Sequence, residues 1–147
     1  MPRSYDWQLR IKAVELRYAA AHLAISRLLE TARRDPTVLT GGLEFGDVVS
    51  ASKDLEGTYL IRLFAEFESG SRLYFDTLRD TNPRTKDLLD SLAALCGISE
   101  VHRDNAHAVR EYRNCLVHER MEEAVPISIA RARSYLCCFF SHLPNEW

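Results

Sequence analysis

The residues best suited to chemistry are an arginine, an asparagine and a histidine that lie within six positions of one another. They are Arg113, Asn114 and His118, in a segment (110–120) that reads REYRNCLVHER. Arginine can bind a phosphate group through two charge-assisted hydrogen bonds. Free histidine titrates near pH ~6.5, so it can act as an acid or a base at neutral pH, and asparagine can orient it or donate to a phosphate oxygen. Together the three residues indicate chemistry on a phosphate.

One amphipathic helix must present these three side chains. At about 100° per residue, Asn114 and His118 lie one turn apart on the same face. This polar stripe continues toward the N-terminus through Arg103, His107 and Arg110. The opposite face is expected to point to the core and comprises Val101, Ala108, Val109, Tyr112, Cys115 and Leu116. Arg113 falls at the border, where a long side chain can still bring its guanidinium to the polar side.

The rest of the chain is expected to form four more helices. Periodicity and end signals predict them over about Asp6–Arg34, from Ser52 or Asp54 to about Thr81, over Thr85 to about Cys96, and from a first turn that holds Pro126. Gly97 ends the third helix, and Ser99 caps the motif helix. The connection over about 35–52 exceeds the usual ~4–6 residues, so it is either mobile or ordered by a partner. The expected fold class is all-α: one domain over residues 1–147, an up-and-down bundle of about five helices with one long loop between the first two.

Two of these helices carry a clear inward stripe. The stripe of the second helix is Leu60, Leu63, Phe64, Phe67, Ser71, Tyr74 and Leu78, and that of the last helix is Ile129, Ala132, Leu136, Phe139, Phe140 and Leu143. Glu68 and Arg72 have the favourable i,i+4 order of a surface ion pair. Alternatively they line a cleft that faces the motif helix and orient its side chains, with Gly70 permitting the close approach of the helices.

The first helix has two apolar faces. Beside its inward residues runs a second stripe of Leu9, Ala13, Leu16, Ala20 and Leu23. One neighbouring helix cannot cover both faces, so the second stripe is either a subunit interface or part of a central helix buried on both sides.

Composition limits the classes of function. Hydrophobic residues make up 46% of the chain and charged residues 27%, which are ordinary globular values. The net charge of −2 argues against a strongly basic nucleic-acid binder, so any RNA site must be local. No apolar run approaches the ~18 residues of a membrane span, and residues 1–6 lack the apolar core of a signal peptide. We therefore expect a cytoplasmic protein without membrane contact.

The four cysteines are Cys96, Cys115, Cys137 and Cys138, and none of them forms a C-x-x-C pair. In a cytoplasmic chain they are expected to be reduced, small apolar residues. His118 follows Cys115, and His142 follows Cys138, by about one helical turn, so spacing alone leaves a zinc site open. Neither pair matches a zinc-finger pattern, and we expect no metal site.

The motif resembles that of a known family. An arginine, a polar residue, an apolar spacer and a histidine near the end of a helix, in a small all-helical chain, are similar to the signature of HEPN (higher eukaryotes and prokaryotes nucleotide-binding) domains. The matching residues are Arg113, Asn114 and His118, with residues 115–117 as the spacer. Many HEPN domains are metal-independent endoribonucleases, often toxins or defence effectors, and many act as dimers.

The resemblance implies that Arg113, Asn114 and His118 are catalytic, that RNA is the substrate, and that two chains pair so that two motif histidines meet. No metal or cofactor is expected. The candidate substrate-binding residues around them are Arg110, Arg120, Arg72 and Glu68. Partners implied are a second copy and a cognate antitoxin or larger defence complex. Some HEPN toxins carry a tyrosine two residues after the histidine, where a partner enzyme modifies it; here Arg120 takes that position, so this form of silencing is not expected.

Each motif residue also has a structural explanation. Arg113 can pair with Glu66, Glu68 or Glu119; a helix dipole favours a histidine near its C-terminus; and Asn114 can cap or solvate the helix. The alternative to an endoribonuclease is a non-catalytic helical module that dimerises or binds a nucleotide or a protein. Only the enzyme requires His118 to be accessible and near Arg113. DNA binding is disfavoured, because no helix-turn-helix pairing is evident and the net charge is negative.

Overall fold

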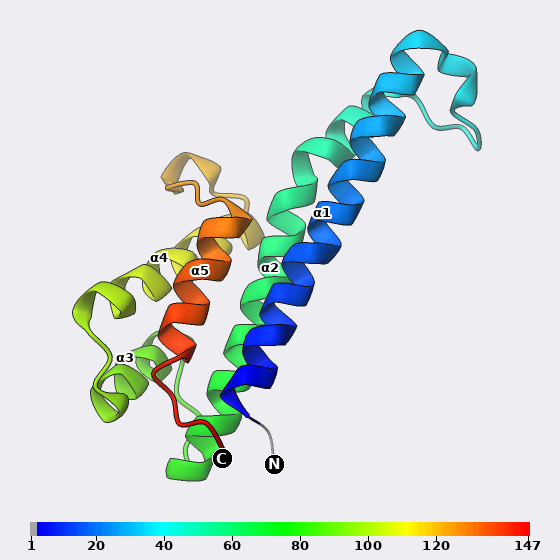
Figure 1. Cartoon of the computed structure of the whole chain (residues 1–147). Helices are drawn as coiled ribbons and strands as arrows, with labels where there is room; N and C mark the ends of the chain where they lie inside the picture. The colour runs from blue at the N-terminus through cyan, green and yellow to red at the C-terminus, as the bar shows by residue number, and fades with distance from the viewer. Residues whose placement is uncertain (1–2) are drawn as a thin grey trace.

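The computed structural model describes residues 3–147 and contains five α-helices within that range (Figure 1). They are α1 (Ser4–Arg34), α2 (Phe45–Leu78), α3 (Thr85–Cys96), α4 (Glu100–Val117) and α5 (Ile129–Phe140), with short 3-10 turns η1 (Pro36–Val38) and η2 (Met121–Glu123). Met1 and Pro2, which belong to the stretch expected to lack a signal sequence, lie outside the described residues. The expected all-α bundle is confirmed.

Two long helices form the frame of the molecule. Helices α1 and α2 make an antiparallel hairpin, and α3, α4 and α5 pack beside one end of it while the other end projects (Figure 1). At the packed end, residues 3–4 lie beside residues 145–146. The Ser4 N–H donates to the Asn145 carbonyl at 3.1 Å, and Arg3 pairs with Glu146 at 3.3 Å. No helix within residues 3–147 combines the length and the apolar character that a bilayer crossing requires.

The core lies where the hairpin meets the three shorter helices. All six inward residues predicted for α5 are buried, and so are those predicted for α2 except Leu78, which is exposed near the end of that helix. The predicted core face of α4 was wrong at Val101, which is exposed, while Ala106 is fully buried in its place. The amphipathic pattern thus located the core of α2 and α5 well and failed at helix ends, where neighbours no longer cover the face.

The predicted start of α2 was wrong. The helix begins at Phe45 rather than at Ser52 or Asp54, and it ends at Leu78 rather than near Thr81. Its first turn is stabilised by Asp47, whose carboxylate accepts a hydrogen bond from the Glu44 N–H at 2.8 Å. The long connection therefore shrinks to residues 35–44.

That connection is ordered in large part by its own contacts. Asp35 accepts from the N–H and the hydroxyl of Thr37 at 3.1 and 2.6 Å, which holds the η1 turn. Gly41 and Gly42 have φ angles of 68° and 79°, a conformation that glycine adopts without strain.

The ends of α4 follow the sequence signals, whereas the start of α5 does not. Ser99 caps α4 by accepting from the His102 N–H at 3.3 Å, and the helix stops at Val117, beyond which Glu119 has a φ of 55°. Helix α5 begins at Ile129 instead of near Pro126. The reason is capping: the Ser128 hydroxyl accepts from the Arg131 N–H at 3.2 Å, and the Glu56 carboxylate accepts from the Ile129 N–H at 2.7 Å.

Gly70 lets α1 and α5 pack closely on α2, whereas the prediction was a close approach of α4. A Cβ at this position would lie 2.7 Å from Trp7 of α1 and 2.8 Å from Phe140 of α5, so the glycine serves those contacts and not the contact with α4. The α2 glycine that faces α4 is Gly57, where a Cβ would lie 3.1 Å from Leu116.

The second apolar stripe of α1 is not covered within the described chain. Leu9, Leu16 and Leu23 are all exposed, so the alternative of a helix buried on both sides was wrong for this chain alone. A subunit interface at this stripe stays a prediction.

Candidate functional site

Glu68, in the C-terminal half of α2, joins three helices. Its Oε1 accepts from the Thr85 hydroxyl at 2.6 Å and from Arg72 Nη2 at 2.8 Å, and its Oε2 accepts from Arg113 Nη2 at 3.3 Å. Thr85 is the first residue of α3, and Arg113 lies in the next-to-last turn of α4. The carboxylate therefore fixes the start of α3 and the motif arginine relative to α2.

The environment keeps Glu68 ionised. Partial burial raises its pKa, but the hydrogen bonds from Thr85 and Arg72 and the charges of Arg72 and Arg113 outweigh that effect and lower the pKa below its ordinary value. The carboxylate thus stays negative at neutral pH and holds the two guanidinium groups in place.

Arg113 turns toward α2 and pairs with Glu68, one of the partners considered for it, and does not join His118 on the polar face as its border position had suggested. Its guanidinium carbon lies 4.7 Å from the centroid of the Phe64 ring, and one nitrogen contacts Glu68. Only Nη2 is engaged in a hydrogen bond among residues 3–147, so the remaining N–H groups of Arg113 are available to a ligand.

Arg72 has a different position from Arg113. It forms the predicted i,i+4 pair with Glu68, and its Nη1 also donates to Asn82 Oδ1 at 3.0 Å and to the Pro83 carbonyl at 2.9 Å. These contacts hold the connection between α2 and α3. Arg72 lines a hollow on the far side of that connection and not the one beside Arg113.

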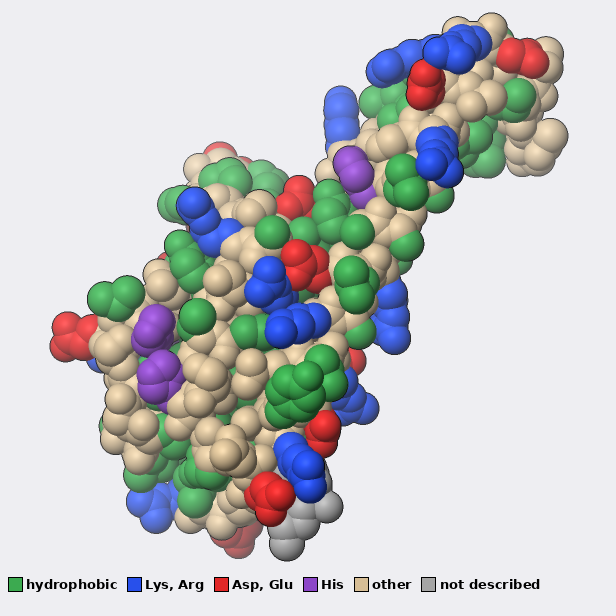
Figure 2. Space-filling view, viewed as in Figure 1, with side chains coloured by type: hydrophobic (Ala, Val, Ile, Leu, Met, Phe, Trp, Pro, Cys, Tyr) green, Lys and Arg blue, Asp and Glu red, His purple; other side chains and the backbone are tan. Residues whose placement is uncertain are grey.

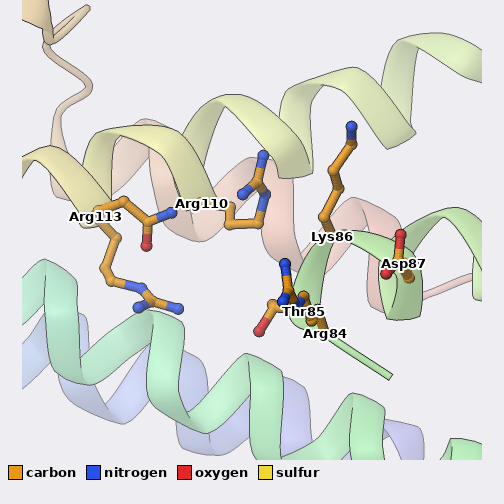
Figure 3. A pocket seen from close by; sticks show the side chains of 7 residues that line it. Arg84, Thr85, Lys86, Asp87, Arg110 and Arg113 are labelled. Carbon is orange, nitrogen blue, oxygen red and sulfur yellow. The ribbon is translucent and has the colours of Figure 1, made fainter. Parts of the chain in front are cut away.

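A basic hollow of about 400 Å³ lies between the start of α3 and α4 (Figure 3). Arg110 and Arg113 of α4 border it on one side, and residues 84–87 border it on the other (Figure 3). Its lining residues are Arg84, Thr85, Lys86, Asp87, Arg110, Arg113 and Asn114. Four cationic side chains and one carboxylate line the hollow. Arg110 is paired with Glu111 and Arg113 with Glu68, each at 3.3 Å, so the local positive charge comes chiefly from Arg84 and Lys86, in a chain whose net charge is −2.

Arg110 is oriented by a neighbour on α4. Its Nε donates to His107 Nδ1 at 3.3 Å, and His107 Nε2 lies 2.7 Å from Asp90 Oδ1. Because Nδ1 accepts, the hydrogen of the imidazole resides on Nε2 and is donated to Asp90. A chain of hydrogen bonds from α3 thus sets the direction of the Arg110 side chain at the edge of the hollow.

His118 lies in a second, smaller hollow at the end of α4. This hollow measures about 190 Å³ and is lined by Asn114, Cys115, His118, Arg120 and Glu123. The His118 side chain is exposed and makes no hydrogen bond among residues 3–147. The backbone N–H of His118 donates to the Asn114 carbonyl at 3.0 Å. Arg120 lines the same hollow, and its backbone N–H donates to the Cys115 carbonyl at 2.9 Å.

Asn114 lines both hollows, whereas Arg113 lines only the basic one and His118 only the smaller one. Apart from Arg72, which lines a different hollow, and Glu68, the predicted site residues therefore lie in two neighbouring groups that share Asn114. Arg110 and Arg113 belong to the first group, His118 and Arg120 to the second, and Glu68 lies behind Arg113.

Arg84 and Lys86 were not among the predicted site residues. They flank the first residue of α3, which donates to Glu68 of α2, the same carboxylate that pairs with Arg113 of α4. A local signal existed, since two basic residues follow Pro83 where a helix was expected to begin. Their proximity to the motif helix depends on a tertiary contact that periodicity does not reveal.

The cysteines do not form a cluster with other metal ligands. All four are free thiols, and no three His, Cys, Asp or Glu side chains within residues 3–147 gather as a metal site would require. Burial raises the pKa of the Cys137 thiol.

Comparison with known proteins gives no match to a family model, a curated protein or a solved structure.

Proposed function

We propose that this protein is a metal-independent endoribonuclease that cleaves RNA by attack of the ribose 2′-hydroxyl. The observation that carries the proposal is the position of Asn114, which lines both the basic hollow and the hollow of His118. An RNA backbone bound over the basic hollow would place a neighbouring phosphodiester next to an accessible histidine and an amide.

The charge distribution supports RNA over an uncharged ligand. Arg84, Lys86, Arg110 and Arg113 converge on one hollow from two helices. Single-stranded RNA carries a phosphate at each nucleotide, and basic grooves that follow the backbone are how proteins bind it without a strongly basic overall charge.

The cleavage needs one base and one acid. The base takes the proton of the 2′-hydroxyl as its oxygen bonds to phosphorus; the P–O5′ bond breaks, and the acid protonates the leaving oxygen. The products are a 2′,3′-cyclic phosphate and a 5′-hydroxyl. His118 is the candidate base, and Asn114 and Arg113 are the candidate donors to the phosphate oxygens in the transition state.

A second chain would complete the set of groups. One chain supplies one motif histidine, so in a pair of chains the second His118 would act as the acid. Arg113 contacts Glu68 through one nitrogen only, so in each protein chain its other N–H groups can donate to the RNA phosphate.

Cleavage of a mixed-sequence RNA in excess EDTA tests the proposal. The parent should leave 2′,3′-cyclic phosphate and 5′-hydroxyl ends, and His118→Ala should lower the rate by about 100-fold or more. His22→Ala is the matched control, because His22 is an exposed histidine on α1 that lines neither hollow. Equal cleavage by His118→Ala, or no cleavage by the parent, would sink the enzyme proposal.

A second candidate function follows from the way Arg113 is held. Its ion pair with Glu68 and its contact with the Phe64 ring give the motif arginine a structural role that needs no substrate. In that case the chain is a non-catalytic helical module. Neither the parent nor His118→Ala would then cleave RNA, and the substitution would leave stability unchanged.

A further inference from the structure

The outward face of α1 carries a regular apolar seam. Its exposed side chains are Tyr5 (61% exposed), Leu9 (44%), Leu16 (71%) and Leu23 (52%). The three leucines recur every seven residues, with Ala13 and Ala20 between them, which is the a/d pattern of a helix that packs on another helix.

Nothing within residues 3–147 covers this seam. Helix α1 packs on α2 and α5 through the opposite side, where Trp7, Ile11 and Val14 are buried. The seam runs along α1, one of the two helices of the long hairpin, whose surface in Figure 2 carries hydrophobic and basic side chains together with a few acidic ones. Residues 5–23 span about 27 Å at ~1.5 Å per residue, the length of a partner helix of about 18 residues.

The charges that flank the seam have one sign. In the register set by the leucines, the flanking positions beside the seam are occupied by Arg10, Lys12 and Arg17, with uncharged residues at the others. Lys12 and Arg17 are exposed and form no ion pair among residues 3–147, while Arg10 lies 4.0 Å from Glu66.

The carboxylates of α1 do not offset Lys12 and Arg17. Glu15 points away from the seam, because its Oε2 accepts from Arg133 Nε of α5 at 2.6 Å. Asp6 occupies an a position at the N-terminal end of the seam, between Tyr5 and Leu9, and from Leu9 to Leu23 the helix holds no carboxylate other than Glu15. The middle of the seam is therefore an apolar strip between basic edges.

We infer that the outward face of α1 binds an acidic amphipathic helix of another protein. Apolar residues of that helix would pack between Leu9, Leu16 and Leu23, and its Asp or Glu residues at flanking positions would pair with Lys12 and Arg17. Flanking charges select the partner in helical pairs, because like charges at these positions repel and opposite charges attract.

The same charges disfavour a second copy of the chain at this face. Every charged flanking residue is basic, so two α1 helices packed along the seam would offer no flanking carboxylate to these cations, and a parallel pair would set Lys12 against Arg17. A membrane surface fits less well too, because a seam one leucine wide gives an interfacial helix little apolar area to insert.

A designed peptide supplies the probe. A labelled peptide of about four heptads, with leucine at the a and d positions and glutamate at the flanking positions, is titrated with the full chain and followed by fluorescence anisotropy. The control peptide carries lysine in place of glutamate. The glutamate peptide should bind at least about tenfold more tightly than the lysine peptide, and Leu16→Asp should weaken it by about tenfold or more.

A charge exchange separates pairing from general attraction. The double variant Lys12→Glu with Arg17→Glu should reverse the preference in favour of the lysine peptide, while Arg33→Glu with Arg34→Glu, at the far end of α1, should not. All these positions are exposed, and circular dichroism checks that each variant is folded.

Three results would overturn the inference. The first is equal binding of the two peptides, or binding of neither. The second is a dimer in sedimentation equilibrium that Leu16→Asp dissociates, which would assign the face to a second copy. The third is co-sedimentation with vesicles of anionic lipid that Leu16→Asp abolishes, which would assign it to a membrane. None of these measurements depends on ribonuclease activity.

Discussion

Arg113 Nη2 donates to Glu68 Oε2 at 3.3 Å and so ties the motif helix α4 to the C-terminal half of α2. The two residues are 45 positions apart in the chain, and the side chain of each is 22% exposed. The motif arginine is consequently not a free surface cation. It is held in one direction by a carboxylate that also fixes Arg72 and Thr85.

Removal of Glu68 should destabilise the fold. Glu68→Ala leaves two partly buried guanidinium groups without their shared counter-ion, and we expect the free energy of unfolding to fall by about 2 kcal/mol. Glu66→Ala is the matched control, because Glu66 lies on the same helix and only meets Arg10 at 4.0 Å. Urea denaturation measures both; similar losses for the two variants would contradict a central role of Glu68.

The pKa of Glu68 also predicts a dependence of stability on pH. Because its pKa is lowered in the folded state from an ordinary value of 4.5, the unfolded state binds more protons as the solution is acidified. The stability that Glu68 contributes is therefore present above about pH 4.5 and lost as pH falls through the folded pKa.

Glu68→Gln removes this titration. The difference in free energy of unfolding between parent and Glu68→Gln should be constant from pH 7 to 5 and should shrink below the ordinary value of 4.5. Urea denaturation at several pH values measures it. A difference that stays constant down to pH 3 would show that Glu68 does not stabilise the fold through its charge.

Local sequence signals were enough to predict the ends of the helix that carries the motif and the end of the helix before it. Short-range chemistry explains three of these features. Ser99 caps α4, Gly97 ends α3 in the left-handed conformation with a φ of 64°, and α4 ends beside His118. These features need no knowledge of neighbouring helices, because each depends on backbone groups within one turn.

The start of α2 was harder to predict, because two signals competed. Gly41, Gly42 and Gly46 indicated a loop, whereas the hydrogen bond from Glu44 to Asp47 stabilises a helix that already includes Gly46. Glutamate, the residue at the N-cap of α2, is not among the preferred capping residues, whereas serine, at position 52, is, so the sequence favoured the later start.

The basic hollow depends on contacts that lie far apart in the chain. Arg84 and Lys86 lie beside α4 because α3 packs on α4 and because Thr85, at the start of α3, donates to Glu68 of α2, 17 residues away. The spacing of residues along one helix does not specify which loop end will lie against it. The candidate site was predictable on α4 and was not predictable on α3.

The contacts of Gly70 predict a sharp cost for a single methyl group. Gly70→Ala would place a Cβ 2.7 Å from Trp7 and 2.8 Å from Phe140, and these rings are packed against other core residues. We expect a loss of about 1–3 kcal/mol in the free energy of unfolding. Gly46→Ala is the control, since no atom lies within 4 Å of its added Cβ, and it should be neutral or slightly stabilising. Equal effects in thermal unfolding would contradict the close approach at Gly70.

The basic hollow predicts how RNA binding depends on salt. If Arg84 and Lys86 each bind a phosphate, the variant with both changed to alanine should bind RNA more weakly at low salt. The slope of log K against log salt should then be less steep by roughly 0.7 for each phosphate that the variant no longer neutralises. A single-stranded RNA with 2′-O-methyl groups separates binding from cleavage, because it has no hydroxyl to attack.

The matched control is the double variant Arg33→Ala with Arg34→Ala, which removes the same charge from the far end of α1. It should leave the slope unchanged, because these residues lie on the projecting part of the hairpin (Figure 1). If both double variants reduce the slope equally, binding would reflect net charge alone and the hollow would not be the RNA site. If only the Arg84 and Lys86 variant does so while the parent cuts no RNA, the hollow binds RNA in a protein that is not a ribonuclease.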